Sequence, residues 1–179
     1  MDLKGRKIVV LAEEAFEDLE LWYPVLRLRE EGCEVTIAGS GSSDTYKGKH
    51  GVPVKVDRNI GDISADDYDG IIVPGGWAPD RLRRYDAVKK LVRQFAEQKK
   101  LLATICHGPW VFISAGVVKG YKMTCVEAIV DDIVNAGAVY VDQEVVVDRN
   151  MITSRRPPDL PAFMREIIRY LKQNHQNGL

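Results

Sequence analysis

The sequence predicts an α/β fold in which a mostly parallel sheet carries helices on both faces. Short apolar runs typical of buried strands alternate with segments of helical periodicity along the whole chain. The 179 residues are 45% hydrophobic and 28% charged, which suits one globular domain with a sizeable core. Because no repeat or low-complexity linker divides the chain, we expect a single domain over residues 1–179.

The expected strands are of two kinds. Continuous apolar runs predict buried strands at Lys7–Ala12, Glu34–Gly39, 70–74 and Leu101–Ile105. Segment 52–56 alternates as a strand and follows a Gly- and Ser-rich loop at 39–51. Segments 144–148 and Met151–Ser154 flank Arg149-Asn150, which predicts a hairpin near the end of the sheet.

The expected helices follow from apolar residues at helical spacing. They cover 16–31, 86–98, 111–116, 128–136 and a long amphipathic stretch that begins at Leu160. Pro24 falls inside the first of them and is expected to kink or restart it.

Composition excludes several classes of function. With Lys+Arg 25 against Asp+Glu 26, the formal charge of −1 leaves no electrostatic footprint for nucleic acid. No apolar run approaches the roughly 18 residues needed to span a membrane. The charged N-terminus leads straight into a strand, so we expect no signal peptide and a cytoplasmic protein. The number of cysteines is odd, and the three are widely spaced, without the spacing of zinc ligands. We therefore expect neither a disulfide scaffold nor a metal site.

Cys106 is the strongest candidate for chemistry. The strand Leu101–Ile105 runs directly into Cys106, Gly108 follows, and a helix begins beyond, which is the pattern of a nucleophile elbow. Gly108 is expected because the turn brings backbones too close for a Cβ. A thiol at a helix N-terminus is expected to have a lowered pKa. Cys33 and Cys125 have no such setting and are expected to be inert.

Other candidates lie after neighbouring strands, where parallel strands end at one edge of the sheet. His107 is next to the thiol and suits a general base, although it needs an orienting acid from elsewhere. Gly75 and Gly76 follow a strand and suit an oxyanion site. Acidic residues crowd the start of the first helix, and composition does not decide which of them faces the thiol. These residues are Glu13, Glu14, Glu17, Asp18 and Glu20.

Two segments rich in small residues are weak candidates for nucleotide binding. The segment 39–44 lacks the last glycine of a dinucleotide fingerprint. Gly48-Lys49-His50 lacks both the spacing of a P-loop and its Ser/Thr. No nucleotide is therefore expected.

Six ordered blocks of the sequence resemble the ThiJ/PfpI family, and within it the PfpI-type intracellular proteases, over nearly the entire chain. The blocks are Phe16-Glu17-Asp18-Leu19-Glu20-Leu21, Gly48-Lys49-His50-Gly51, Pro74-Gly75-Gly76-Trp77-Ala78-Pro79-Asp80, Ala103-Thr104-Ile105-Cys106-His107-Gly108-Pro109, Asp131-Asp132-Ile133-Val134-Asn135-Ala136-Gly137 and Asp159-Leu160-Pro161-Ala162-Phe163. The resemblance implies a flavodoxin-like three-layer sandwich shared with class I glutamine amidotransferase domains.

The resemblance also implies roles for individual residues. Cys106 matches the family's nucleophile, and His107 matches the histidine of its triad. Glu17 matches the carboxyl group that, when protonated, hydrogen-bonds the cysteine sulfur. Asp80 falls where these proteins place an acid, often Glu, that reaches the histidine across a subunit interface. Gly76 and the backbone N–H of His107 resemble the oxyanion site.

Members of the family are described as cysteine peptidases, cofactor-free glyoxalases and protein deglycases. All three reactions open with attack of the cysteine thiolate on a carbonyl carbon. The resemblance therefore implies a stress-related, cofactor-free cysteine hydrolase that acts on small carbonyl or glycated substrates, and on peptides in the peptidase case. It also implies a homo-oligomer, a dimer or a hexamer, with an intersubunit active site and with Trp77 and Trp110 near the pocket mouth. The alternative is a redox sensor or chaperone that uses oxidation of Cys106.

Overall fold

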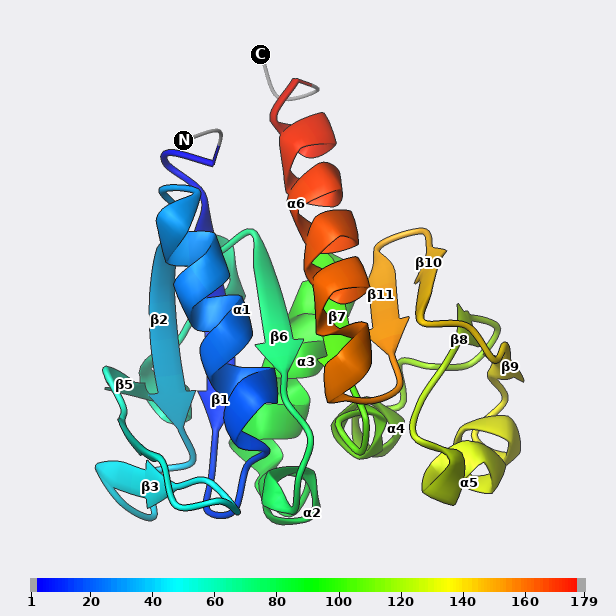
Figure 1. Ribbon diagram of the computed structural model, residues 1–179, viewed down its shortest axis with the longest axis horizontal. Coiled ribbons are helices and arrows are strands. Elements are labelled where there is room, and N and C mark those ends of the chain that lie inside the picture. Colours follow the sequence, from blue (N-terminus) through cyan, green and yellow to red (C-terminus); the bar gives the residue numbers. More distant parts are fainter. Residues whose placement is uncertain (1–2, 177–179) are drawn as a thin grey trace.

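A seven-stranded sheet forms the centre of the computed structural model, which describes residues 3–176 (Figure 1). The strand order is β10-β11-β7-β6-β1-β2-β5, and every pair is parallel except β10 with β11. The strands are β1 (Lys7–Ala12), β2 (Glu34–Gly39), β5 (Arg58–Asn59), β6 (Gly70–Val73), β7 (Leu101–Ile105), β10 (Val145–Asp148) and β11 (Met151–Ser154). The predicted mostly parallel sheet and the terminal hairpin are confirmed.

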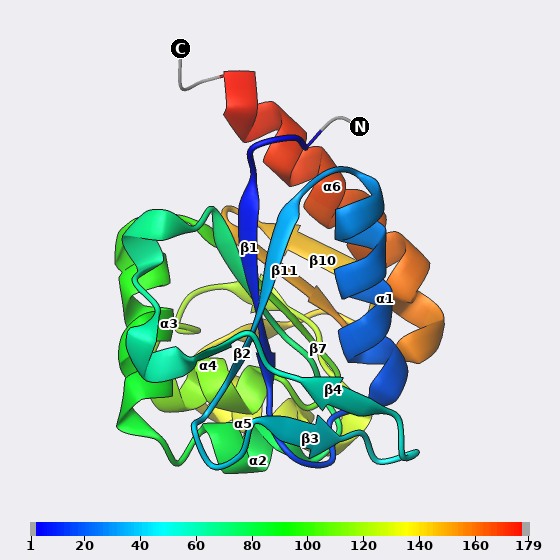
Figure 2. The ribbon, with the colours of Figure 1, turned by 90° about the vertical axis from the view of Figure 1, so that its left-hand side faces the viewer.

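Helices cover both faces of this sheet (Figure 2). On one face lie α1 (Asp18–Glu30) and α6 (Leu160–Gln176). On the other lie α3 (Asp86–Glu97) and α4 (Pro109–Ala115), and α2 (Ala78–Leu82) packs against α4 at the lower end of the sheet (Figure 2). The three layers confirm the expected flavodoxin-like sandwich.

Smaller elements lie outside the three layers. They are β3 (Thr45–Lys47), β4 (Pro53–Lys55), β8 (Lys122–Met123), β9 (Val139–Tyr140), α5 (Val130–Asn135) and four short 3-10 helices at Ile60–Asp62, Ala65–Asp67, Glu127–Ile129 and Pro157–Asp159. The strand β8 pairs with β9, beside α5.

The core lies between the sheet and its helices, as the hydrophobic patterns predict. After its exposed first residue, β1 is buried at every position, because helices cover both of its faces. In α3 the buried residues are Val88, Leu91, Val92 and Phe95, at the spacing that places them on one face of a helix.

Two expectations from the sequence are wrong. Pro24 does not restart the helix, because α1 runs unbroken from Asp18 to Glu30 with Leu21, Val25 and Leu28 buried against the rest of the core. The segment 39–51 is not wholly a loop, because β3 within it pairs antiparallel with β4. This hairpin forms around the buried pair Tyr46 and Val54, which are directly opposite each other.

The carboxyl ends of β1, β2 and β6 point to the same side of the molecule (Figure 1). Since β7 is parallel to β6, the residues after it emerge on that side as well. Segments far apart in sequence therefore meet at one edge, as predicted for a ligand site. In the described part of the chain, no helix is long and apolar enough to cross a bilayer.

Candidate active site

Cys106 lies on a sharp turn between β7 and α4. Its backbone φ is +62°, a left-handed conformation that non-glycine residues rarely adopt. Its N–H donates to the carbonyl of Ser154 at 3.1 Å, and its own carbonyl accepts from the N–H of Val126 at 3.2 Å. These two bonds hold the strained turn, so the predicted nucleophile elbow is present.

Gly108 makes this turn sterically feasible, as predicted. A Cβ at this position would lie 2.0 Å from the Thr104 Oγ1 and 2.5 Å from the carbonyl oxygen of Val73. The Thr104 hydroxyl also donates to that carbonyl at 3.0 Å, which ties β7 to β6 beneath the thiol.

His107 provides a base within reach of the thiol. Its Nδ1 lies 3.3 Å from the Cys106 sulfur. The imidazole lies between Trp77 and Trp110, with ring centroids 5.7 Å and 5.1 Å away. Burial and the positive charge of Lys49 lower the pKa of His107, so the ring is neutral at neutral pH and Nδ1 is available to accept a proton.

Glu20, in the first turn of α1, is the carboxyl group that lies against the thiol. Its Oε2 accepts the Gly75 N–H at 2.7 Å, and its carboxyl interacts with the Cys106 sulfur. A Cβ on Gly75 would lie 2.4 Å from that Oε2 and 2.7 Å from the Cys106 Cβ, so only glycine fits between them. Burial, followed by the nearby charge of Glu17, raises the pKa of Glu20 to about 8. Glu20 is therefore protonated at neutral pH.

The expected lowering of the Cys106 pKa is wrong for this chain. Burial, followed by the negative charge of an ionised Glu20, raises the pKa of Cys106 to about 12. The backbone N–H groups of His107 and Gly76 act in the opposite direction. Loss of solvation is the largest of these effects, so it outweighs the two backbone N–H groups at the turn before α4. The resting site therefore pairs a neutral thiol with a neutral imidazole.

Glu17, for which the family resemblance implied a contact with the sulfur, has a different position. It is the N-cap of α1, and its Oε2 accepts the Glu20 N–H at 2.9 Å. Its Oε1 lies 3.8 Å from the His50 Nε2, and its side chain lines the same cavity as Cys106. The assignment missed Glu20 because both glutamates lie in one acidic run. The only available signal was their i,i+3 spacing, which places them on one face of the helix.

The remaining acidic residues of that run serve the surrounding loops. Asp18 accepts the N–H groups of His50 and Val52, both at 2.9 Å. Glu14 accepts the Lys47 N–H at 3.1 Å. Glu13 accepts hydrogen bonds from Ser40 and Ser42.

The segment around Gly76 is held against the start of α1. The Glu17 N–H donates to the Gly75 carbonyl at 3.1 Å, and the Trp77 N–H donates to the Ala15 carbonyl at 2.8 Å. Gly76 has φ +75°, and a Cβ there would lie 2.4 Å from the Glu17 nitrogen. This packing fixes the Gly76 N–H near the thiol.

Asp80 lies on α2, and its carboxylate forms an ion pair with Arg84, which follows that helix. Within residues 3–176, no hydrogen-bond partner is found for the His107 Nε2. The expected contact between Asp80 and the histidine of another subunit concerns an assembly and stays a prediction.

A cavity of about 260 Å³ opens onto the thiol. Besides the residues described above, its lining includes Lys49, Val126, Arg156 and Pro157. Neither Lys49 nor Arg156 was predicted from the sequence to belong to the site. They come from loops separated by about a hundred residues, and only the tertiary fold brings them together.

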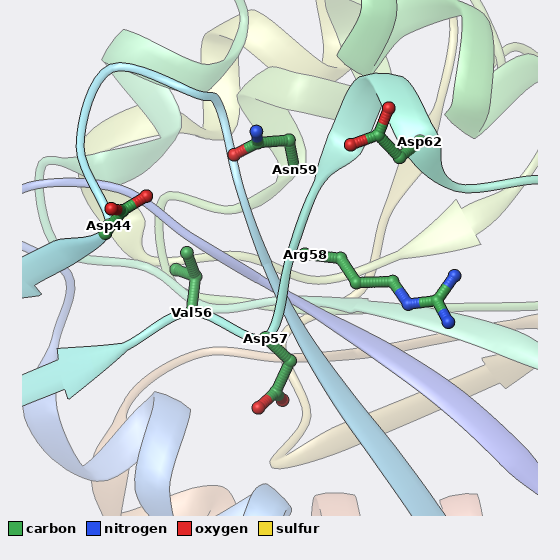
Figure 3. Close-up of a pocket in the computed structure, with 6 residues that line it drawn as sticks. All are labelled: Asp44, Val56, Asp57, Arg58, Asn59 and Asp62. Atoms are coloured by element: carbon green, nitrogen blue, oxygen red, sulfur yellow. The ribbon is translucent and has the colours of Figure 1, made fainter.

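A second cavity, of about 330 Å³, lies beside β5 and has a different character (Figure 3). It is lined by Asp44, Val56, Asp57, Arg58, Asn59 and Asp62. The labelled side chains do not converge on one point. The Asp57 carboxylate accepts the Ile37 N–H at 2.8 Å, a structural bond. This cavity offers no thiol or imidazole for the predicted chemistry.

Glu17, Asp18 and His50 bring potential metal-ligand atoms within 4.8 Å of one another. However, both oxygens of Asp18 and one of Glu17 already accept backbone N–H groups. The cluster therefore anchors the 48–52 loop to α1. The expectation that the protein uses no metal stays a prediction.

The other two thiols are buried away from this site. Burial is the main cause that raises the pKa of Cys33 and of Cys125 to about 12. The Cys33 thiol donates to the Arg6 carbonyl at 3.2 Å. Neither thiol lines the Cys106 cavity, which agrees with the expectation that they are inert.

Comparison with known proteins agrees with this architecture. The family model of the DJ-1/PfpI family matches residues 6–170. The chain is 48% identical to the protein named Deglycase PfpI of Pyrococcus furiosus, over 93% of this chain and 99% of that protein. It is 42% identical to Protein/nucleic acid deglycase 2 of Escherichia coli, over 93% of this chain and 98% of that protein.

A solved structure shows the same fold. A protein from Anabaena variabilis with a DJ-1/ThiJ/PfpI-like and a ferritin-like domain superposes with a TM-score of 0.91 at 40% identity. The match covers 93% of this chain and 48% of the Anabaena chain, so the present chain spans about half of that two-domain protein. With a family match over most of its length and close relatives of the same size, the chain belongs to the DJ-1/PfpI family.

Proposed function

We propose that this protein is a cysteine-dependent hydrolase that acts on small carbonyl compounds and glycated amines, with Cys106 as nucleophile. The observation that carries the proposal is the 3.3 Å approach of the Cys106 sulfur to the His107 Nδ1, on a strained turn inside a small cavity. The deglycase names of two relatives support the same class of reaction.

The first step follows from the protonation states of the site. As the sulfur bonds to the carbonyl carbon, the thiol proton moves to the neutral His107 Nδ1. The carbonyl π electrons move to its oxygen, and we expect the N–H groups of Gly76 and His107, which interact with the Cys106 sulfur, to donate to that oxyanion. Protonated Glu20 adds no negative charge beside the developing anion, because its pKa lies near 8.

The cavity favours small substrates. Its volume of about 260 Å³ is below the usual range for drug-sized ligands, about 300–1,000 Å³. The apolar part of its lining consists of Trp77, Val126 and Pro157. We therefore place glyoxalase III-like and deglycase activities ahead of peptidase activity on folded proteins.

We also propose that the protein works as a homo-oligomer. Leu19, Tyr23 and Leu26 are exposed on α1 at i, i+4 and i+7, which gives this helix an uncovered apolar stripe. The unfilled Nε2 of His107 suits an acid from a neighbouring subunit, and Asp80 is the candidate. A dimer and a hexamer both fit this proposal. We also keep the cytoplasmic location and the stress-related role as parts of the proposed function.

A role as a redox sensor is less favoured. Sensor cysteines are typically low-pKa, accessible thiols, whereas burial raises the pKa of Cys106. A sensor also has no need of the His107 imidazole at hydrogen-bonding distance.

Cys106→Ala tests the nucleophile. The purified variant should form no lactate from methylglyoxal while keeping the wild-type circular dichroism spectrum. The matched control is Cys125→Ala, which should keep turnover. Lactate formation by Cys106→Ala at the wild-type rate would overturn the proposal.

Deglycase and glyoxalase activities are separable by kinetics. The loss of a purified methylglyoxal–arginine adduct is followed at rising enzyme concentration. With a deglycase, the rate of adduct loss rises in proportion to the enzyme concentration, because the enzyme attacks the adduct itself. An enzyme that only removes free methylglyoxal reaches a plateau at the spontaneous rate of adduct dissociation.

Subunit mixing tests the role of Asp80. Asp80→Ala and Cys106→Ala should each be impaired alone. Mixed oligomers should regain turnover, because an intact Asp80 from one subunit then faces an intact Cys106–His107 pair in its neighbour. Full activity of Asp80→Ala, or no recovery on mixing after verified subunit exchange, would contradict the intersubunit arrangement.

A further inference from the structure

Two basic side chains, Lys49 and Arg156, line the Cys106 cavity and have no part in the chemistry described above. We propose that they form an anion-binding subsite, so that the preferred substrate is a small carbonyl compound that carries a carboxylate or a phosphate. This inference rests on the proposed function and specifies its substrate class.

The backbone of Lys49 is held in place by the start of α1. Its N–H donates to the Phe16 carbonyl at 2.8 Å, and the Gly48 N–H donates to the Val52 carbonyl at 2.9 Å. A Cβ on Gly48 would lie 2.3–2.5 Å from the carboxylate atoms of Asp18, so only glycine allows Asp18 to bind this loop. The Gly48-Lys49-His50-Gly51 block, which fits no P-loop, thus presents a lysine to the cavity.

The ammonium group of Lys49 is available to a ligand. Among residues 3–176, no carboxylate lies within salt-bridge distance of its Nζ. Lys49 lines the same cavity as Cys106, Glu20 and His107, and its positive charge lies close enough to act on the pKa of each of them.

Arg156 reaches the cavity from the loop after β11. The adjacent Arg155 holds this loop through ion pairs with Asp159 at 2.9 Å and Asp142 at 2.8 Å. Within the described residues, Arg156 itself forms one ion pair, with Glu127 at 3.4 Å, and both side chains are more than half exposed. An exposed pair of this kind is weak, so an anionic ligand can compete for the guanidinium.

The charge balance of the cavity favours an anion. Among the residues that line the cavity, Lys49 and Arg156 are the basic side chains, and Glu17 is the acidic one besides Glu20, which is protonated at neutral pH. Glu127 lies outside the lining and is linked to Arg156 by the weak exposed ion pair described above. The two cations approach from separate loops, an arrangement suited to a carboxylate or phosphate beside a carbonyl bound at Cys106.

Alkylation of Cys106 tests the subsite without any turnover. Iodoacetate and iodoacetamide are similar in size but differ in charge. Each alkylates the sulfur, which forms the S–C bond as iodide leaves and the thiol loses its proton. The rate at Cys106 is measured by mass spectrometry of its peptide. We expect the iodoacetate/iodoacetamide rate ratio to fall about tenfold or more in the Lys49→Met, Arg156→Met double variant.

The single variants and a control sharpen the test. Lys55→Met removes an exposed lysine of the same hairpin region that does not line the cavity, and its rate ratio should equal that of the wild type. If the double variant does not fold, Arg156→Met is used alone, since an exposed side chain can be replaced without disturbing the fold. This variant should still lower the iodoacetate/iodoacetamide rate ratio. A ratio unchanged by these substitutions would overturn the subsite.

Protection experiments identify the anion. Lactate, inorganic phosphate and glyceraldehyde 3-phosphate are each tested for slowing of alkylation by iodoacetamide in the wild type and in Lys49→Met. Protection that depends on Lys49 supports the subsite and shows whether it selects carboxylate or phosphate, whereas no protection by any of the three contradicts it. If Cys106→Ala keeps turnover while alkylation of Cys106 in the wild type shows the expected anion selectivity, the proposed function is wrong and the subsite is supported.

Discussion

Replacement of Glu20 by Gln gives a quantitative test of the protonated carboxyl beside the thiol. Gln has nearly the same shape, its carbonyl oxygen can accept the Gly75 N–H, and it has no ionisable proton. In the wild type, burial raises the pKa of Glu20 from 4.5 to about 8. The folded protein therefore retains a proton that the unfolded chain releases as the pH rises.

The sign and size of the effect follow from this difference. Between the unfolded and folded pKa values the folded state binds more protons, so the wild type loses free energy of unfolding as the pH rises. The free energy of unfolding falls by about 1.4 kcal/mol for each pH unit between the two pKa values. Ionisation of Glu20 in the unfolded chain therefore lowers it by less than about 0.5 kcal/mol at pH 4.5 and by about 3 kcal/mol at pH 7. In Glu20→Gln this decrease in the free energy of unfolding is absent, because Gln does not ionise.

The assay is urea unfolding of both proteins from about pH 4.5 to about pH 8, monitored by tryptophan fluorescence. The difference in free energy of unfolding between Glu20→Gln and wild type should rise by about 3 kcal/mol from pH 4.5 to pH 7 and by about 4 kcal/mol by pH 8. Other titrating groups are common to both proteins and largely cancel. Glu97→Gln is the matched control, since its side chain is exposed at the end of α3.

A pH-independent difference would refute the reasoning. It would mean that Glu20 is ionised in the folded protein at neutral pH. The thiol would then face a carboxylate, and the neutral environment assigned to the nucleophile would be incorrect.

Two further substitutions test the base and the elbow. His107→Ala should lower turnover by about 10²–10⁴-fold. The wild-type rate should fall only below the ordinary histidine pKa of 6.5, because burial lowers the pKa of His107 and the ring stays neutral to a lower pH; a fall centred above 6.5 would contradict this. Gly108→Ala places a Cβ 2.0 Å from the Thr104 Oγ1 and should destabilise the fold by about 1–3 kcal/mol or more in urea unfolding; unchanged stability would show that the turn is looser than described.

Most of the fold is predictable from local sequence patterns. The apolar runs of β1 and β7 are too short for a helix and rich in β-branched residues, which indicates buried strands, and the spacing of the apolar residues in α3 indicates one face of a helix. The hairpin β3–β4 escaped prediction because β3 is three residues long, with one buried side chain, Tyr46. So short a segment has no measurable periodicity, and its strand pairing depends on contact with Val54.

The candidate site divides in the same way. Cys106, His107 and Gly108 are contiguous, and the turn they form is encoded locally, so the sequence identifies them. Glu20 and Glu17 are equivalent in composition and differ only in what surrounds them in the folded chain. Glu20 is fully buried beside Gly75, whereas Glu17 caps the helix, and a sequence pattern does not contain that distinction.

The sequence by itself determined the α/β class, the order of the main elements and the elbow cysteine, because each depends on neighbours within a few positions along the chain. Only the tertiary structure decided the protonation of Glu20, the raised pKa of Cys106 and the presence of Lys49 and Arg156 in one cavity. These properties depend on desolvation and on charges from distant segments, which exist only once the chain has folded.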